Sequence, residues 1–127
     1  MNEFFNRIRK VISEVTTERA PFEFAAIVDR LDNPIPGKYD LLLSAPWIER
    51  ERAFDEYFFS KLKKEDWKKL SRVIFLNPLG EFMAEFQQVI GPLGRDRDLQ
   101  NVRIGDIDVR YAHLFATHSL NSSYVPK

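Results

Sequence analysis

The chain has 127 residues, 44% of them hydrophobic and 30% charged, a composition typical of one domain with a packed core and a solvated surface. Nineteen basic residues balance nineteen acidic ones, so the basic excess typical of nucleic-acid modules is missing and self-association meets little charge repulsion. The absence of cysteine excludes disulfides, thiolate metal sites and cysteine nucleophiles. The sequence has no leader-like apolar run at its N-terminus and no apolar run of membrane-spanning length, so we expect a soluble cytoplasmic protein without membrane association.

Residues 2–17 predict an amphipathic helix. Asn2 suits its N-cap, and Glu3 suits the positive end of the helix dipole. Apolar residues recur at spacings of three and four and form one stripe: Phe4, Phe5, Ile8, Val11, Ile12 and Val15. This stripe either covers a sheet or pairs with its counterpart in a dimer.

Two strands and a connecting loop are expected next. Residues 22–29 alternate with the period of a strand, although the spacing of their apolar residues also fits a short helix. Residues 32–37 are almost all turn formers. Residues 39–48 contain three consecutive leucines ahead of Pro46, which indicates a strand buried on both faces. The pair predicts an antiparallel hairpin with a long loop.

A crossover follows the hairpin. A helical stretch opens at Glu49 and extends to Leu62, and the charged residues 63–66 suit a break before a second, short helix. Residues 73–76 are another short run of β-forming apolar residues and predict a second buried strand. Because a crossover joins them, this strand should lie parallel to residues 41–44, as its neighbour at the centre of the sheet.

The C-terminal third predicts one more helix and one or two strands. Asn77 and Pro78 suit the N-cap and the first turn of the helix. Its apolar face comprises Leu79, Phe82, Met83, Phe86, Val89 and Ile90. Residues 93–101 are expected to form a polar loop, residues 105–106 a tight turn or a bulge, and residues 108–117 a final strand.

Together these elements predict a single α/β domain over residues 1–118, with α+β as the alternative. A mixed sheet of four to five strands would contain the N-terminal hairpin and the βαβ crossover, with helices packed on it. Residues 119–127 lack periodicity and are expected to form a flexible tail.

A first candidate site lies where the two parallel strands end. Ligands of open α/β sheets bind beyond the carboxyl ends of such strands. That edge should gather a candidate binding set: Ser44, Trp47, Glu49, Arg50 and Asn77. Ser44 lacks the Gly-x-Ser-x-Gly setting that exposes a nucleophilic serine. The alternative is that these residues only begin helices and cap the core.

A second candidate site consists of carboxylates. Asp106 and Asp108 point the same way if they lie on one strand, and with Asp40 they are the candidate catalytic residues. Such a pair can hold a divalent cation for phosphoryl transfer. The Gly-Ser pair that precedes it in nucleotidyltransferases does not occur in the sequence, and we assign no metal site and no cofactor. Alternatively, residues 105–106 turn a hairpin, Asp108 faces water, and Asp40 caps a helix or pairs with a basic residue.

Histidines and a basic cluster complete the polar features. His113 and His118 are five residues apart, which in a strand or a helix prevents them from binding one ion, and they predict structural or surface histidines. The only cluster of cations comprises Lys61, Lys63, Lys64, Lys68, Lys69 and Arg72. Trp67 lies within it and could stack on a base, but Glu65 and Asp66 dilute the charge. A solvated helix face with Trp67 in the core is the alternative.

No residue set specifies a reaction. We therefore expect a non-enzymatic module that binds another protein or forms a homodimer, because large apolar residues are abundant for a short chain and can leave a patch for association. One alternative is a metal-dependent enzyme acting on nucleotides or phosphate esters through the three aspartates. Another is a nucleic-acid-binding accessory protein that uses the basic cluster.

Overall fold

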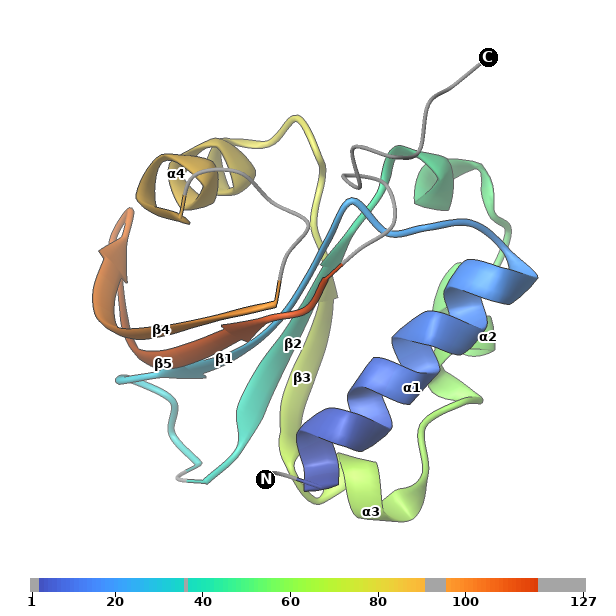
Figure 1. Ribbon diagram of the computed structural model, residues 1–127, viewed down its shortest axis with the longest axis horizontal. Coiled ribbons are helices and arrows are strands. Elements are labelled where there is room, and N and C mark those ends of the chain that lie inside the picture. The colour runs from blue at the N-terminus through green and yellow to red at the C-terminus, as the bar shows by residue number, and fades with distance from the viewer. Residues whose placement is uncertain (1–2, 36, 91–95, 117–127) are drawn as a thin grey trace.

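The computed structural model describes residues 3–35, 37–90 and 96–116, and it has helices on both faces of one mixed sheet (Figure 1). The elements in chain order are α1 (Glu3–Glu18), β1 (Phe24–Arg30), β2 (Tyr39–Ser44), the 3-10 helix η1 (Pro46–Arg50), α2 (Phe54–Phe59), α3 (Lys64–Trp67), β3 (Leu70–Phe75), α4 (Glu81–Ile90), β4 (Arg97–Ile104) and β5 (Ile107–Leu114). Helix and strand content together confirm the α/β or α+β class predicted from the sequence.

The sheet has five strands in the order β3-β2-β1-β5-β4. β1 pairs antiparallel with β2, which confirms the N-terminal hairpin, and β2 pairs parallel with β3, which confirms the crossover. β5 pairs antiparallel with both β1 and β4. The prediction that β3 lies at the centre of the sheet is wrong: β3 is an edge strand, and β1 is central. Within the described residues, one flank of β3 therefore has no partner strand.

Helices α1, α2 and α3 lie on one side of the sheet (Figure 1). The whole apolar stripe of α1 is buried there, so the prediction of a helix that covers a sheet is confirmed. Alternate residues of β1 and β2 face this layer, among them Ile27 and Leu41. The other residues of the same strands, such as Val28 and Leu42, face the opposite layer. β2 is thus buried on both faces, as its three leucines predict.

Helix α4 lies on the opposite side of the sheet, over β1, β5 and β4 (Figure 1). Its buried residues are Met83 and Phe86, and the Phe86 ring meets Phe24 of β1 at a centroid distance of 4.8 Å. On β3, two strands away from β1, Ile74 is only partly buried. The α4 layer therefore covers the sheet incompletely, and this gap positions the site described below.

Three local predictions differ from the structure. Ala53 adopts a left-handed conformation with φ of 56° and divides the stretch predicted to be one helix from Glu49 onward. Trp67 is 38% exposed rather than part of the core. Residues 97–101 belong to β4 rather than to a loop. A backbone break accounts for the first difference, and strand pairing with β5 accounts for the third.

The start of α4 also differs from its prediction, because the helix begins at Glu81 and not at Asn77. The side chain of Asn77 accepts a hydrogen bond from the amide of Leu79, and its carbonyl accepts one from Gly80. A turn therefore precedes the helix, and Leu79 points away from the apolar face to which it was assigned. Gly105 and Asp106 do form the tight turn between β4 and β5, and the positive φ of Gly105 suits the first central position of a type II′ turn.

No helix within the described residues is long and apolar enough to span a membrane. The predicted tail at 119–127 and His118 lie outside the part of the chain that the structure describes.

Candidate binding site between β3 and helix α4

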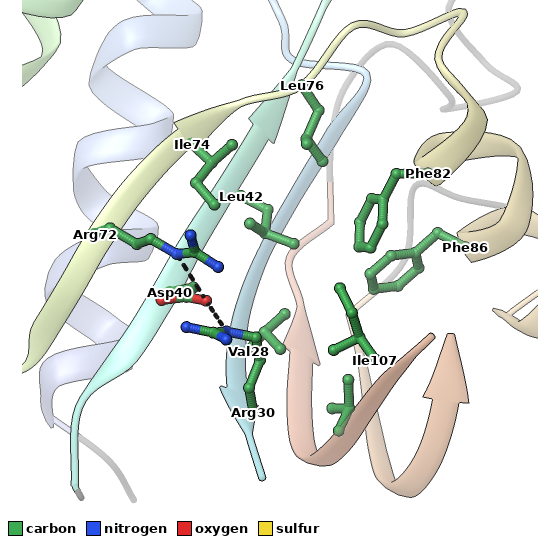
Figure 2. Close-up of a pocket in the computed structure, with 11 residues that line it drawn as sticks. Val28, Arg30, Asp40, Leu42, Arg72, Ile74, Leu76, Phe82, Phe86 and Ile107 are labelled. Carbon is green, nitrogen blue, oxygen red and sulfur yellow. Dashed lines mark hydrogen bonds and ion pairs between the residues drawn. The ribbon is translucent and has the colours of Figure 1, made fainter. Parts of the chain in front are cut away.

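A half-open pocket of about 240 Å³ lies on the sheet face beside α4 (Figure 2). Its lining comprises Val28, Arg30, Asp40, Leu42, Arg72, Ile74, Leu76, Phe82, Phe86, Ile107 and Val109. An engineered apolar cavity of roughly 150 Å³ holds one benzene ring, whereas drug-sized ligands occupy about 300–1,000 Å³. The pocket therefore has the size of one large side chain or one small ring compound.

Strand alternation places the lining residues on one face. Residues two apart on a strand point the same way, so Arg72, Ile74 and Leu76 follow one another along β3 and its end. Phe82 and Phe86 are four residues apart on α4 and form the opposite wall. Figure 2 shows the apolar side chains between these walls and the charged groups together at the opposite end from Leu76.

The charged end is built around Asp40, whose side chain is nearly inaccessible, the residue being only 1% exposed. One carboxylate oxygen, Oδ2, accepts a hydrogen bond from Nε of Arg30 at 2.5 Å and lies 3.2 Å from Nε of Arg72. The register explains the grouping, because Asp40 is directly opposite Val28 on β1 and Arg72 on β3. Of the two roles considered for Asp40, the structure shows the pairing with basic residues.

This ion cluster is incompletely satisfied. The second carboxylate oxygen of Asp40, Oδ1, is buried and has no hydrogen-bond partner among the described residues. Leaving such a group unsatisfied costs about 1–3 kcal/mol. Arg30 also reaches Asp32 at 2.9 Å, whereas the side chain of Arg72 is half exposed and has no other ion pair among the described residues. Arg72 therefore keeps donor capacity at the rim of the pocket.

The residues predicted at the carboxyl ends of β2 and β3 have mainly structural contacts. Ser44 is fully buried and donates to the carbonyl of Leu76 at 2.8 Å. Trp47 donates from Nε1 to the carbonyl of Pro21, and Asn77 stabilises the turn before α4. Glu49 and Arg50 are exposed in η1, and none of the five predicted residues lines the pocket. A ligand at this edge stays a prediction.

The structure separates the environments of the three candidate aspartates. Asp40 lines the pocket, whereas Asp106 lies in the exposed turn and Asp108 lies 3.3 Å from the guanidinium of Arg103. Within the described residues, no three histidine, aspartate or glutamate side chains are grouped so as to hold a metal ion. Catalysis by these carboxylates stays a prediction.

A second polar cluster lies on the other face, beside α1. Nδ1 of His113 lies 2.6 Å from Asp98, and Nε2 lies 3.0 Å from a guanidinium nitrogen of Arg9. These contacts place the ring proton on Nδ1, since Arg9 can only donate. The hydroxyl of Tyr111 donates to Asp98 at 2.7 Å. The hydrogen bonds from His113 and Tyr111 hold the pKa of Asp98 below its usual value.

This cluster resembles a catalytic carboxylate–imidazole pair only in part. The Nε2 atom that would act as a base already accepts a hydrogen bond from Arg9. The ring is also sandwiched between Phe5 and Phe115, at centroid distances of 5.3 and 4.8 Å. A structural role fits this environment better than proton transfer, in agreement with one of the two roles predicted for this histidine.

Sequence reasoning did not find Arg30, Arg72 or Asp98 as partners in these clusters. Asp98 lies directly opposite His113 in the pairing of β4 with β5, so it could be found only once β4 was recognised as a strand. In the basic cluster, Lys61 is paired with Glu14 and Glu18 on α1 and is therefore less available than its neighbours. Arg72 belongs to the pocket rather than to that helical face.

Comparison with known protein families, with curated proteins and with solved structures finds no match. The geometry of the pocket and of the polar clusters therefore carries the functional argument.

Proposed function

We propose that this protein is a non-enzymatic protein-interaction module whose contact site is the pocket between β3 and α4. The observation that supports this most directly is an apolar pocket the size of one side chain, left open beside an edge strand. Interfaces commonly centre on an anchor side chain that fills such a pocket. A partner would present one large aliphatic or aromatic residue there.

The lining explains why an apolar anchor is favoured. Leu42, Ile74 and Leu76 contribute aliphatic surface from the sheet, and Phe82 and Phe86 contribute ring surface from the helix. Full burial of a leucine or phenylalanine side chain is worth about 1.5–3 kcal/mol, which makes one anchor a substantial part of a modest affinity.

The charged end would give the contact its orientation. Arg72 is half exposed at the rim, and arginine is enriched at interfaces because its guanidinium offers several donors in a fixed plane. A carboxylate or carbonyl oxygen of the partner that lies near this rim would accept those donors. The pocket thus combines an apolar floor with a polar edge, as interaction sites do.

An NMR titration tests the proposal. Addition of N-acetyl-L-leucinamide to the 15N-labelled full chain should produce saturable shifts in the amides of Val28, Leu42 and Ile74, with a dissociation constant in the millimolar range. N-acetylglycinamide is the matched control, because it has the same amides and no apolar side chain. In a sample that sediments as a monomer, shifts that are absent up to about 50 mM, or equal for both compounds, would overturn the proposal; a dissociation constant of 1 mM corresponds to roughly 4 kcal/mol.

A further inference from the structure

We infer that the occupant of the pocket is Leu79 of a second copy of this chain, so that two copies form a symmetric dimer. This inference rests on the proposed function and specifies its partner. In a two-fold interface, the same surface patch meets itself, and each copy must carry both the protruding group and the recess that receives it. The described residues provide both within one short segment.

The protruding group is Leu79, which is 95% exposed. An exposed apolar side chain becomes informative when it adjoins other exposed apolar surface, because the two together can form one patch for association. Leu79 lies at the third position of a turn that two hydrogen bonds close, both at 2.9 Å and both accepted by Asn77. The turn holds the backbone of Leu79 in place, so its ordering on association costs little conformational entropy.

Leu79 belongs to the loop that joins two residues of the pocket lining. It is midway in sequence between Leu76 and Phe82, and both of these residues line the pocket. Figure 2 shows the loop that joins them at the end of the pocket away from the arginines. Because the protruding Leu79 and the pocket are close in the chain, each copy can insert its leucine into the pocket of the other across one two-fold axis. A pocket of about 240 Å³ has room for a leucine side chain.

The charges of this surface are also self-complementary. Glu81, two residues after Leu79, is exposed and has no ion-pair partner among the described residues. Arg72, at the other end of the pocket, is half exposed. In the inferred dimer, the carboxylate of Glu81 from one copy is available to pair with the guanidinium of Arg72 in its twin. A net charge of zero removes long-range repulsion between copies.

Sedimentation velocity of the full-length chain tests the inference. The unsubstituted protein should pass from monomer to dimer between about 1 µM and 1 mM. Leu79→Ser should weaken the dimer at least about 100-fold, because two leucines leave two pockets and each burial is worth roughly tenfold or more in affinity. Ile35→Ser is the matched control, since Ile35 is 46% exposed in the β1–β2 loop and lies outside the pocket; its dimer should be unchanged.

Two further variants probe the other sides of the interface. Ile74→Glu places a charge on the pocket floor, and Glu81→Lys reverses the charge two residues after Leu79. Both should weaken the dimer while circular dichroism shows an unchanged fold. If Ile74→Glu does not fold, Leu79→Ser and Glu81→Lys still decide the question, because both residues are exposed and make no core contact.

The outcomes separate this inference from the proposed function. A strict monomer at 1 mM, with the pocket amides still shifting on addition of N-acetyl-L-leucinamide, overturns the dimer and leaves the interaction module in place. A dimer that Leu79→Ser and Ile35→Ser affect equally overturns this interface. Loss of the dimer in Leu79→Ser alone supports it.

Discussion

The replacement Asp40→Ala should destabilise the fold far more than Asp108→Ala. Both residues are strand aspartates paired with arginine, at 2.5 Å for Asp40–Arg30 and 3.3 Å for Asp108–Arg103. They differ in burial, since Asp40 is 1% exposed and the side chain of Asp108 is 54% exposed. The comparison therefore contrasts a buried carboxylate that pairs with two arginines and an exposed carboxylate that pairs with one.

The magnitude follows from three contributions. Removing one partner of a buried pair costs about 3–5 kcal/mol, because the other charge is left without compensation. Two features reduce this value. The substitution removes the unpaired Oδ1 of Asp40 and so recovers part of the penalty of about 1–3 kcal/mol for burying that oxygen without a partner. Arg30 also keeps Asp32 as an ion-pair partner. A net loss of about 2 kcal/mol remains for Asp40→Ala, against about 0–1 kcal/mol for Asp108→Ala.

Urea unfolding followed by circular dichroism measures both values on the full chain. A loss of about 2 kcal/mol should also lower the melting temperature by roughly 8 °C for a domain of this size. The double variant Arg30→Met with Asp40→Leu should recover most of the loss, since apolar groups can replace a buried ion pair at little cost. Equal losses for Asp40→Ala and Asp108→Ala would refute the reasoning.

The remaining predictions concern a turn, a capped helix and pH. Gly105→Ala should cost about 1–2 kcal/mol, because Gly105 has a φ of +60°, and equal stability in thermal unfolding would contradict the turn geometry. Asp66→Ala should lower the free energy of unfolding in urea by about 2–3 kcal/mol, because buried Asp66 binds Arg7 at 2.8 Å and also accepts a hydrogen bond from the amide of Lys63 at the start of α3. Loss of a helix cap alone typically costs about 1 kcal/mol. A loss below about 0.5 kcal/mol would argue against these contacts. The pKa of Asp98 is lowered in the folded state by its hydrogen bonds, so its contribution is present above the unfolded value near 3.8 and is lost as pH falls below it. The stability difference between the unsubstituted protein and Asp98→Asn should therefore shrink on acidification below about pH 4, and a difference that grows there would contradict the sign.

Elements with a clear internal period could be predicted from the sequence. The apolar stripe of α1 repeats at helical spacing, which predicts a helix with one buried face. The three leucines of β2 leave no polar face, which predicts a strand buried on both sides. The start of α4 was misplaced because Asn77 and Pro78 suit both a helix N-terminus and a turn. Both arrangements satisfy the local rules, so the local sequence does not decide where the helix begins.

β4 escaped prediction for a different reason. Residues 97–101 comprise two charged residues, the single buried Leu99 and two amides, so the segment has the composition of a loop. Its strand conformation depends on pairing with residues 111–114 of β5, which come later in the chain. Local patterns carry no information on such pairing.

Of the pocket site, only the pairing of Asp40 with a basic residue could be predicted from the sequence. An acidic residue at the start of a buried strand predicts a basic partner for Asp40, and the structure supplies Arg30 and Arg72. The pocket itself depends on strand order, because β3 at the edge leaves Ile74 partly uncovered, whereas β3 at the centre would have buried it. Strand order follows from the packing of all five strands and not from any one segment.

The most direct test of the central claim is an isotope-filtered NOE experiment on an equal mixture of 13C-labelled and unlabelled chains. If the pocket receives an apolar side chain from another molecule of this protein, intermolecular NOEs should connect the methyl groups of Leu79 with those of Ile74 and Leu76. A sample that sediments as a dimer but shows NOEs only between other surfaces would contradict the account.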